Sequence, residues 1–249
     1  MDVWQACEEK IRRIPLAGTV YRIVESQEQV ATHHLVDDLE EQAVLENLLE
    51  ATKPTLPENS TYFHYLLYTP FRYPPLEYGS RFGSKHEPSL FYGSRSLQTA
   101  LAECAFYRLY FWQGMLEPPP SKQITTQHTA FTATIKTTEG LQLQASPFNT
   151  YQATLIHRSS YQATQQLGTA MRGNQIAAFE YKSARDSDGG INVGLFNLSA
   201  LRNKKPSSFS SLLCTTSAES VKFMDSTKTV YSFPLELFLE QGEFPEPAN

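Results

Sequence analysis

Apolar and polar residues alternate along several stretches of the chain with the two-residue period of a half-buried β-strand. The longest are 17–24 (GTVYRIVE) and 129–137 (TAFTATIKT), which are also rich in β-branched and aromatic residues. Shorter apolar runs between polar loops predict further strands at 89–94, 175–181, 191–198, 221–225 and 229–233. The predicted strands therefore outnumber the predicted helices.

Apolar residues spaced three or four positions apart, together with start and stop signals, predict helices between the strands. A short helix is expected at 3–13, and a longer one at 97–115 with Ser96 as its N-cap. Another is expected at 161–173, where Gly173 would take the C′ position that ends the helix. Because helices and strands do not alternate regularly, the sequence predicts an α+β fold with a mixed sheet rather than a doubly wound one.

The segment 35–78 differs in composition from its surroundings. Its first part, 35–52, predicts an acidic helix, and 61–78 is an irregular stretch rich in aromatic residues and proline. The helix either packs on the core with a solvated acidic face or provides a docking surface for a partner. We expect a single domain over 1–249, with its core at about 17–235 and the segment 35–78 as a helical and aromatic insertion.

Charge and cysteine content narrow the class of protein. The 249 residues carry a formal net charge of −5 and a pI near 5.7, so no basic stripe is expected to offset a nucleic-acid backbone. No apolar run is long enough to span a bilayer, and the charged first residues, MDVWQACEEKIRRIP, differ from a secretory signal. The widely separated Cys7, Cys104 and Cys214 are expected to be reduced thiols. These features predict a cytoplasmic protein that binds neither nucleic acid nor membrane.

Several common catalytic motifs are absent from the sequence. There is no GxGxxG after a strand, no GxxxxGK[ST] phosphate loop and no GxSxG nucleophile elbow. The adjacent His33 and His34 do not give the facing pair that a metal site requires, and no HExxH pattern occurs. We therefore expect neither a metal site nor a Rossmann-type dinucleotide fold.

Two charged residues stand out as candidates for a binding or catalytic site. On a helical wheel of 97–115, Glu103 lies at the flank of the apolar stripe, where it would border the core and reach into an adjoining cleft. Arg22 shares one face of its strand with Val20 and Val24, so either that face is half exposed or the guanidinium requires an anion. A solvent-facing helix glutamate and an exposed edge arginine are the alternative interpretations.

Three stretches of the sequence resemble the RES domain, a family named for an arginine, a glutamate and a serine. They are VYRIV (20–24), GSRF followed by EPSLFYGSRSLQTALAECAFYR (79–108), and YKSARDSDGGINVGLF (181–196). They occur in the order of the family and at compatible distances. One departure is the segment SRFGSKHEP, which lacks the Trp-Asn dipeptide that usually follows the second arginine of the family.

The resemblance implies a compact fold similar to the ADP-ribosyltransferase toxins, with NAD bound across a cleft. It also implies a toxin of a toxin–antitoxin pair, with a cognate antitoxin that carries a helix-turn-helix-like domain, and it is compatible with a homodimer inside that complex. NAD is then the substrate and not a cofactor, with inorganic phosphate as a candidate co-substrate. The family positions fall on the catalytic candidates Arg22, Tyr92 and Glu103 and on the substrate-binding candidates Arg81 and Ser183. Tyr21 and Ser94, within the matching stretches, are further substrate-binding candidates.

The implied reaction is cleavage of the nicotinamide–ribose bond of NAD by phosphorolysis or hydrolysis. The cationic nicotinamide leaves without an acid, so the barrier lies in the oxocarbenium character of the ribose, beside which Glu103 would place negative charge. Arg22 and Arg81 would hold phosphate oxygens in bidentate geometry. Tyr92 would stack on nicotinamide or ribose, and Ser183 would bond near the sugar. A mono-ADP-ribosyltransferase and a non-catalytic nucleotide-binding or interaction module are the alternatives.

Overall fold

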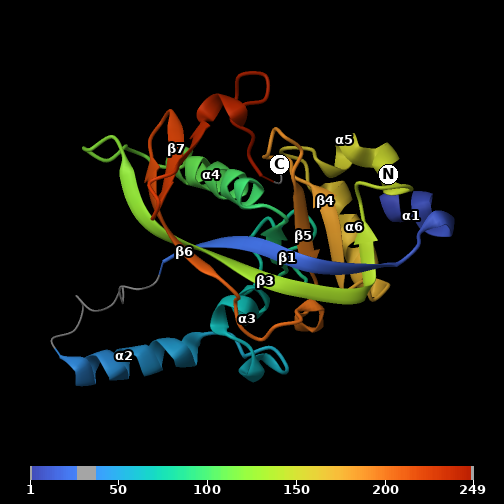
Figure 1. The fold of residues 1–249 in the computed structure, drawn as a ribbon, viewed down its shortest axis with the longest axis horizontal. Helices are drawn as coiled ribbons and strands as arrows, with labels where there is room; N and C mark the ends of the chain where they lie inside the picture. Colours follow the sequence, from blue (N-terminus) through green and yellow to red (C-terminus); the bar gives the residue numbers. More distant parts are fainter. Residues whose placement is uncertain (1, 27–37, 248–249) are drawn as a thin grey trace.

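The computed structural model describes residues 2–26 and 38–247, which form a mixed α+β domain (Figure 1). One eight-stranded mixed sheet contains β1 (Ile14–Glu25), β2 (Phe91–Ser94), β3 (Ile124–Gln142), β4 (Ala178–Lys182), β5 (Ile191–Leu195), β6 (Phe209–Thr216), β7 (Ser220–Asp225) and β8 (Val230–Pro234). The helices, joined in places by short 3₁₀ turns, are α1 (Val3–Cys7), α2 (Leu39–Thr52), α3 (Tyr65–Arg72), α4 (Leu97–Gln113), α5 (Gln152–Leu155) and α6 (Gln162–Gly173). The α+β class expected from the sequence is confirmed.

Strand pairing closes part of the sheet into a ring. The strands follow the order β1-β2-β5-β4-β3-β6-β7-β8, and β1 also pairs with β3 in antiparallel register from Ile14–Gly140 to Glu25–His128. β1, β2, β5, β4 and β3 therefore form a closed circuit. The strands β6, β7 and β8 continue from the outer edge of β3 as an open extension.

Apolar side chains fill the interior of this ring. Val20 of β1 meets Phe91 of β2 and Phe131 of β3 in one buried cluster, to which all five ring strands contribute. Helix α3 covers one end of the ring with the fully buried Leu67. The alternation along β1 therefore turns one set of residues into the ring, whereas Ile23 of the other set packs against the cluster that contains α4.

An ion pair between a partly exposed arginine and a buried glutamate crosses the same ring. Arg95, directly after β2, pairs with Glu180 of β4 through Nη2 and Oε1 at 2.6 Å, and its Nη1 donates to the Thr19 carbonyl of β1 at 3.1 Å. The other carboxylate oxygen of Glu180 accepts from Gln142 of β3 at 2.8 Å. Gly18 has a φ of +114°, and a Cβ there would lie 3.2 Å from Nη1, so glycine leaves the room that the guanidinium needs.

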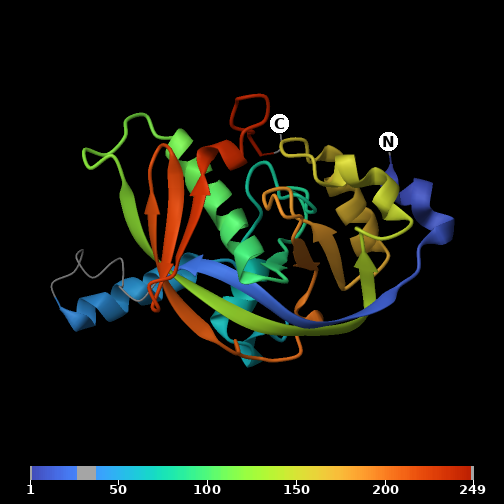
Figure 2. The same cartoon turned by 45° about the horizontal axis from the view of Figure 1, so that its top comes forward.

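Helix α4 lies on the outward side of the ring. Ser96 caps its N-terminus as predicted, because its hydroxyl accepts from the backbone N–H of Thr99 at 3.1 Å. Leu101, Ala105 and Leu109 pack with residues of β6, β7 and β8 in a second apolar cluster. Figure 2 shows α4 between the β7–β8 hairpin and the strands β4 and β5. The helix is thus enclosed by the ring on one side and by the extension on the other.

Tertiary burial explains two elements that the sequence pattern did not predict. The stretch 61–78, expected to be irregular, contains α3, which tolerates Pro70 because Leu67 and Phe71 pack onto the ring core. Strand β6 was also not predicted, and it is fixed by antiparallel pairing along the outer edge of β3. With β1 on its other edge, β3 extends well beyond the predicted range of 129–137.

Two helix ends differ from expectation. α6 ends in a Schellman motif in which Gln175, with a φ of +57°, occupies the C′ position. The N–H of Ile176 accordingly bonds the Met171 carbonyl at 3.0 Å. The prediction that Gly173 takes this position is wrong, because Gly173 is the last helical residue. The leading helix expected over 3–13 is a short α1 followed by a 3₁₀ turn.

Helix α2 stands apart from the apolar clusters. None of its residues is buried, and Leu39 and Leu48 are 79% and 61% exposed. The interpretation that this acidic helix packs on the core is therefore wrong, whereas a docking role stays a prediction. Figure 1 shows α2 extending away from the ring. Residues 35–37 of the predicted helix lie outside the described residues.

The contact between α6 and the segment before β2 allows a direct test of the packing. A Cβ on Gly168 of α6 would lie 1.9 Å from the Phe82 carbonyl oxygen, so Gly168→Ala must push the two backbones apart. We expect a loss of about 1–3 kcal/mol in the free energy of unfolding, measured by urea denaturation. In the control Gly173→Ala the new Cβ meets nothing within 4 Å, and stability should stay constant or rise by up to about 1 kcal/mol. Equal effects of the two variants would contradict the packing described here.

Candidate functional site

A cavity of about 790 Å³ lies between α4 and the neighbouring strands β1 and β2. Its volume falls in the range of about 300–1,000 Å³ that is typical of small-molecule sites. Six of the seven residues predicted from the sequence line it, namely Tyr21, Arg22, Arg81, Tyr92, Ser94 and Glu103. The seventh, Ser183, is buried behind the wall. The structure thus brings together residues that are up to 161 positions apart along the chain (Arg22 to Ser183).

Glu103 of α4 is held by a chain of hydrogen bonds. Its Oε1 accepts from Ser183 Oγ at 2.6 Å and from Asn192 Nδ2 at 2.5 Å. Asn192 is oriented in turn by Ser94, whose hydroxyl donates to Asn192 Oδ1 at 2.6 Å. Neither bond involves Oε2, which has no hydrogen-bond partner among the described residues. One carboxylate oxygen is therefore fixed, and the other remains available to a ligand in the cavity.

Ser183 bonds Glu103 and does not line the cavity. Its side chain is buried, and its Oγ accepts from the backbone N–H groups of Arg185 and Asp186, each at 3.0 Å. The hydroxyl proton is thereby directed to Glu103. The expected contact between Ser183 and a sugar stays a prediction, and the structure shows that Ser183 bonds the carboxylate that borders the cavity.

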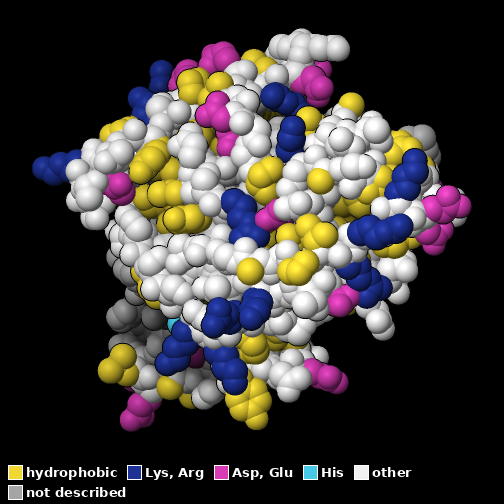
Figure 3. Space-filling view, turned by 45° about the vertical axis from the view of Figure 1, so that its right-hand side comes forward, with side chains coloured by type: hydrophobic (Ala, Val, Ile, Leu, Met, Phe, Trp, Pro, Cys, Tyr) yellow, Lys and Arg dark blue, Asp and Glu magenta, His cyan; other side chains and the backbone are white. Residues whose placement is uncertain are grey.

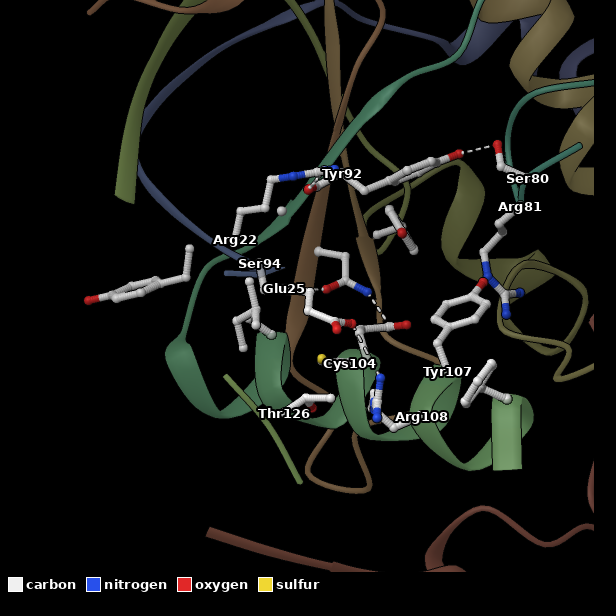
Figure 4. A pocket seen from close by; sticks show the side chains of 18 of the residues that line it. Arg22, Glu25, Ser80, Arg81, Tyr92, Ser94, Cys104, Tyr107, Arg108 and Thr126 are labelled. Carbon is white, nitrogen blue, oxygen red and sulfur yellow. Dashed lines mark hydrogen bonds and ion pairs between the residues drawn. The ribbon is translucent and has the colours of Figure 1, made fainter. Parts of the chain in front are cut away.

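Tyr92 of β2 is fixed by its hydroxyl. That oxygen lies 2.9 Å from Ser80 Oγ and accepts from the backbone N–H of Phe82 at 3.1 Å (Figure 4). Its ring meets Tyr181 edge to face, with centroids 6.5 Å apart. Burial raises the pKa of Tyr92 to about 12, so the phenol stays neutral at physiological pH. Tyr92 can present its ring to a ligand, but it does not serve as a base there.

Arg22 occupies the fork where β1 and β2 separate. The strands share the pair Tyr21–Ser94 and then diverge. The Arg22 guanidinium lies 4.9 Å from the centre of the Phe91 ring, and its Nη1 donates to the Tyr92 carbonyl at 2.7 Å. Burial lowers its pKa to about 10, so it stays cationic at neutral pH, and its buried Nε has no hydrogen-bond partner among the described residues. This is a cation whose counter-charge a bound anion could supply.

Arg81 stands on the other side of the cavity. Its Nη1 donates to the backbone carbonyls of Leu155 and His157 at 3.3 and 2.7 Å. The guanidinium also lies 4.5 Å from the centre of the Tyr161 ring. Figure 4 shows Arg81 beside Tyr107, away from Arg22. Part of its donor fork is thus used for positioning, and the remaining N–H groups border the cavity.

The sequence pattern did not identify several residues of this site. Asn192 lies in the otherwise apolar strand INVGL, and this buried amide was a usable signal because buried polar side chains require partners. Tyr161 and Arg108 line the cavity as well. Their role depends on how α6 and the β3–β6 edge dock, so no local pattern could have revealed it.

A second cavity, of about 700 Å³, lies between β1, α2 and α3. Arg22 and Glu25 line both cavities, so the two cavities approach each other along the second half of β1, where it has separated from β2. At its rim, Glu50 pairs with Lys53 at 2.8 Å and with Arg72 at 2.7 Å. The pair with Arg72 joins the exposed helix α2 to α3, whereas the pair with Lys53 lies within the end of α2.

The described residues also bear on metals, membranes and surface charge. Within 2–26 and 38–247, no three His, Cys, Asp or Glu side chains gather in a way that could hold a metal ion. None of the helices in these ranges combines the length and apolar character needed to cross a bilayer. On the face shown in Figure 3, cationic side chains stand in several groups among acidic and apolar ones. The three cysteines are unpaired, as expected.

The fold and the cavity together define an α+β domain with a fixed carboxylate between flanking cations. The model of the RES domain family matches residues 57–215, more than half of the chain, and the chain belongs to this family. RES domains are associated with NAD-degrading toxins. The match contains Arg81, Tyr92, Glu103 and Ser183, whereas Arg22 precedes it. A comparison with curated proteins finds no match.

The hydrogen bonds that Ser183 makes to Glu103 and to the backbone can be tested by removing its hydroxyl. Ser183→Ala deletes the donor to Glu103 and the acceptor of two backbone N–H groups, at a side chain that is itself buried. We expect the free energy of unfolding to fall by about 1–3 kcal/mol in urea denaturation. The control Ser199→Ala removes an exposed hydroxyl and should change stability by less than about 0.5 kcal/mol. An unchanged stability of Ser183→Ala would contradict the bond network.

Proposed function

We propose that this RES domain cleaves the nicotinamide–ribose bond of NAD. The observation that carries the proposal is the state of Glu103, a carboxylate with one oxygen held by Ser183 and Asn192 and the other free of hydrogen bonds to the described residues. The nicotinamide ring of NAD leaves as a neutral molecule, so the reaction needs stabilisation of positive charge on the ribose more than it needs an acid. A fixed carboxylate beside the ribose supplies that stabilisation.

The remaining wall supports a nucleotide as the ligand. Arg22 and Arg81 border the cavity as cations, and their planar forks match phosphate oxygens. Tyr92 and Tyr181 offer aromatic surface beside them. The neutral state of Tyr92 suits stacking better than proton transfer. In this proposal Glu103 acts on the ribose, the arginines hold the diphosphate, and Ser183 positions Glu103.

The proposal extends to the biological role as a toxin held in check by an antitoxin. Membership of the RES family supports this context. The exposed leucines of α2 are one surface that such a partner could cover. Transfer of ADP-ribose to a protein uses the same cavity, and the product of the reaction distinguishes it from NAD degradation.

Substitution of Glu103 tests the proposed chemistry. Glu103→Gln retains an oxygen that can accept from Ser183 and Asn192 but removes the charge, so nicotinamide release should fall by roughly 100-fold or more in a folded protein. The measurement is chromatographic detection of nicotinamide and of the ADP-ribose product after incubation with NAD. Glu117→Gln, an exposed glutamate beyond the end of α4, is the control with the same charge change and should retain full turnover. Near-normal turnover of the Glu103 variant would remove this residue from the mechanism.

A cellular test addresses the toxin role. Producing the chain in bacteria without a partner should stop growth, and intracellular NAD should fall before viability does, because the substrate pool is consumed. Glu103→Gln should abolish both effects. Growth arrest with unchanged NAD would contradict degradation and favour ADP-ribosylation of a protein target. Mass spectrometry of cell extracts separates these outcomes.

A further inference from the structure

Arg108 is a cation of the main cavity whose hydrogen bonding is incomplete. It follows Glu103 by five positions on α4, a rise of about 7.5 Å along the helix axis. Its Nε donates to Thr216 Oγ1 at 3.3 Å, and its Nη1 lies 3.4 Å from Glu25 Oε2. Its Nη2 is shielded from water and has no hydrogen-bond partner among the described residues. A guanidinium has five N–H donors, and here only two long contacts engage them.

The neighbours of Arg108 do not provide a full counter-charge. Glu25 is 59% exposed at the end of β1, where water screens its charge. Burial raises the pKa of Cys104 to about 12, so the adjacent sulfur stays a neutral thiol. Burial, and further Arg108, lowers the pKa of His128, which favours the neutral imidazole, and an imidazole supplies no negative charge in either state. The Arg108 side chain is nevertheless only 12% exposed.

Arg108 and Arg81 mark different parts of the cavity. Arg81 lies beside Tyr107 and Tyr161, whereas Arg108 lies with Glu25 and Thr126, close to the beginning of β3 (Figure 4). Glu103 precedes Arg108 on the same helix and lines the same cavity. The cavity therefore offers phosphate-binding geometry on two sides of its central carboxylate.

We propose that Arg108 binds a phosphate group at the β3 side of the cavity. A phosphate oxygen that takes the place of Glu25 would accept from Nη1, and rotation of the guanidinium toward the cavity would bring Nη2 out of its shielded position to donate as well. Thr126 also lines this part, and its hydroxyl lies 2.9 Å from His128 Nε2. In the tautomer in which Nε2–H donates to Thr126, the hydroxyl proton is available to the phosphate. Glu25 is then a competitor for the guanidinium, and its exposed position allows it to turn into solvent.

Two sources can supply this phosphate, and the proposal rests on the proposed function only in naming them. One is the diphosphate of the dinucleotide, and the other is free inorganic phosphate as the acceptor. In the second case a phosphate oxygen forms the bond to C1 of the ribose, and nicotinamide leaves with the electron pair of the broken C–N bond. The products are neutral nicotinamide and ADP-ribose phosphate, so atoms and charge balance without a further reactant.

The test combines direct binding with kinetics. Inorganic phosphate and inorganic pyrophosphate are titrated against the folded protein by calorimetry, without NAD. We expect Arg108→Gln to weaken binding of at least one of them by roughly 10-fold or more, and Glu25→Gln to tighten it. Arg108→Lys keeps the charge in case the glutamine variant does not fold, and it should also bind more weakly because the fork is lost. The exposed Arg12→Gln is the matched control and should bind like the parent protein.

The kinetic arm identifies the source of the phosphate. A raised KM for NAD in Arg108→Gln, equal with and without phosphate, assigns Arg108 to the dinucleotide. An unchanged KM for NAD with loss of the phosphate-dependent turnover assigns it to the acceptor. Binding and kinetics like those of Arg12→Gln in folded Arg108 variants would overturn the proposal, even if their stability fell. If neither the parent protein nor any variant cleaves NAD, the proposed function fails. If Arg108→Gln still binds phosphate or pyrophosphate more weakly than the parent protein, the phosphate site stands.

Discussion

The ion pair between Arg95 and Glu180 is the constraint on which the arrangement of the ring depends. Glu180 is almost fully buried, and leaving such a carboxylate without its partner costs about 3–5 kcal/mol. Arg95 also donates to β1, and Glu180 accepts from Gln142 and Gln144, so strands distant in the sequence must all be in place before the charges are satisfied. An apolar pair would tolerate shifts in register that these directional bonds do not. The pair thus favours one arrangement of the ring more than it adds stability.

The same constraint reaches the candidate site through covalent neighbours. Ser94 directly precedes Arg95, and it orients Asn192, which in turn holds Glu103. The carboxylate of Glu103 is therefore held in place by hydrogen bonds to residues of the ring strands as well as by its place on α4. Ser183 adds a second bond to the same oxygen. A carboxylate that is fixed on one oxygen and open on the other combines a defined position with access for a ligand.

The sequence predicted well what depends on local pattern and less well what depends on docking. The alternation at 17–24 and the cap at Ser96 gave a strand and a helix start that the structure confirms. Strand β6 and helix α3 were not predicted, because the first is set by its pairing with β3 and the second by burial against the ring. In the site, six of the seven predicted residues line one cavity, but the role of Ser183 and the presence of Asn192 and Arg108 require three-dimensional contacts.

Arg22 illustrates why some positions in the candidate site could not be predicted from the sequence. The alternation of β1 places it on the inward face with Val20, which alone indicates a side chain turned away from Glu103. However, β1 and β2 diverge after one residue pair, and the Arg22 guanidinium fills the fork between them. It donates to the Tyr92 carbonyl of β2, which has no backbone partner on β1. The gap in the sheet converts an inward residue into one that borders the cavities on both sides. The position of Arg22 beside both cavities is therefore a property of the break in strand pairing, and a strand paired along its full length would have buried the same arginine away from them.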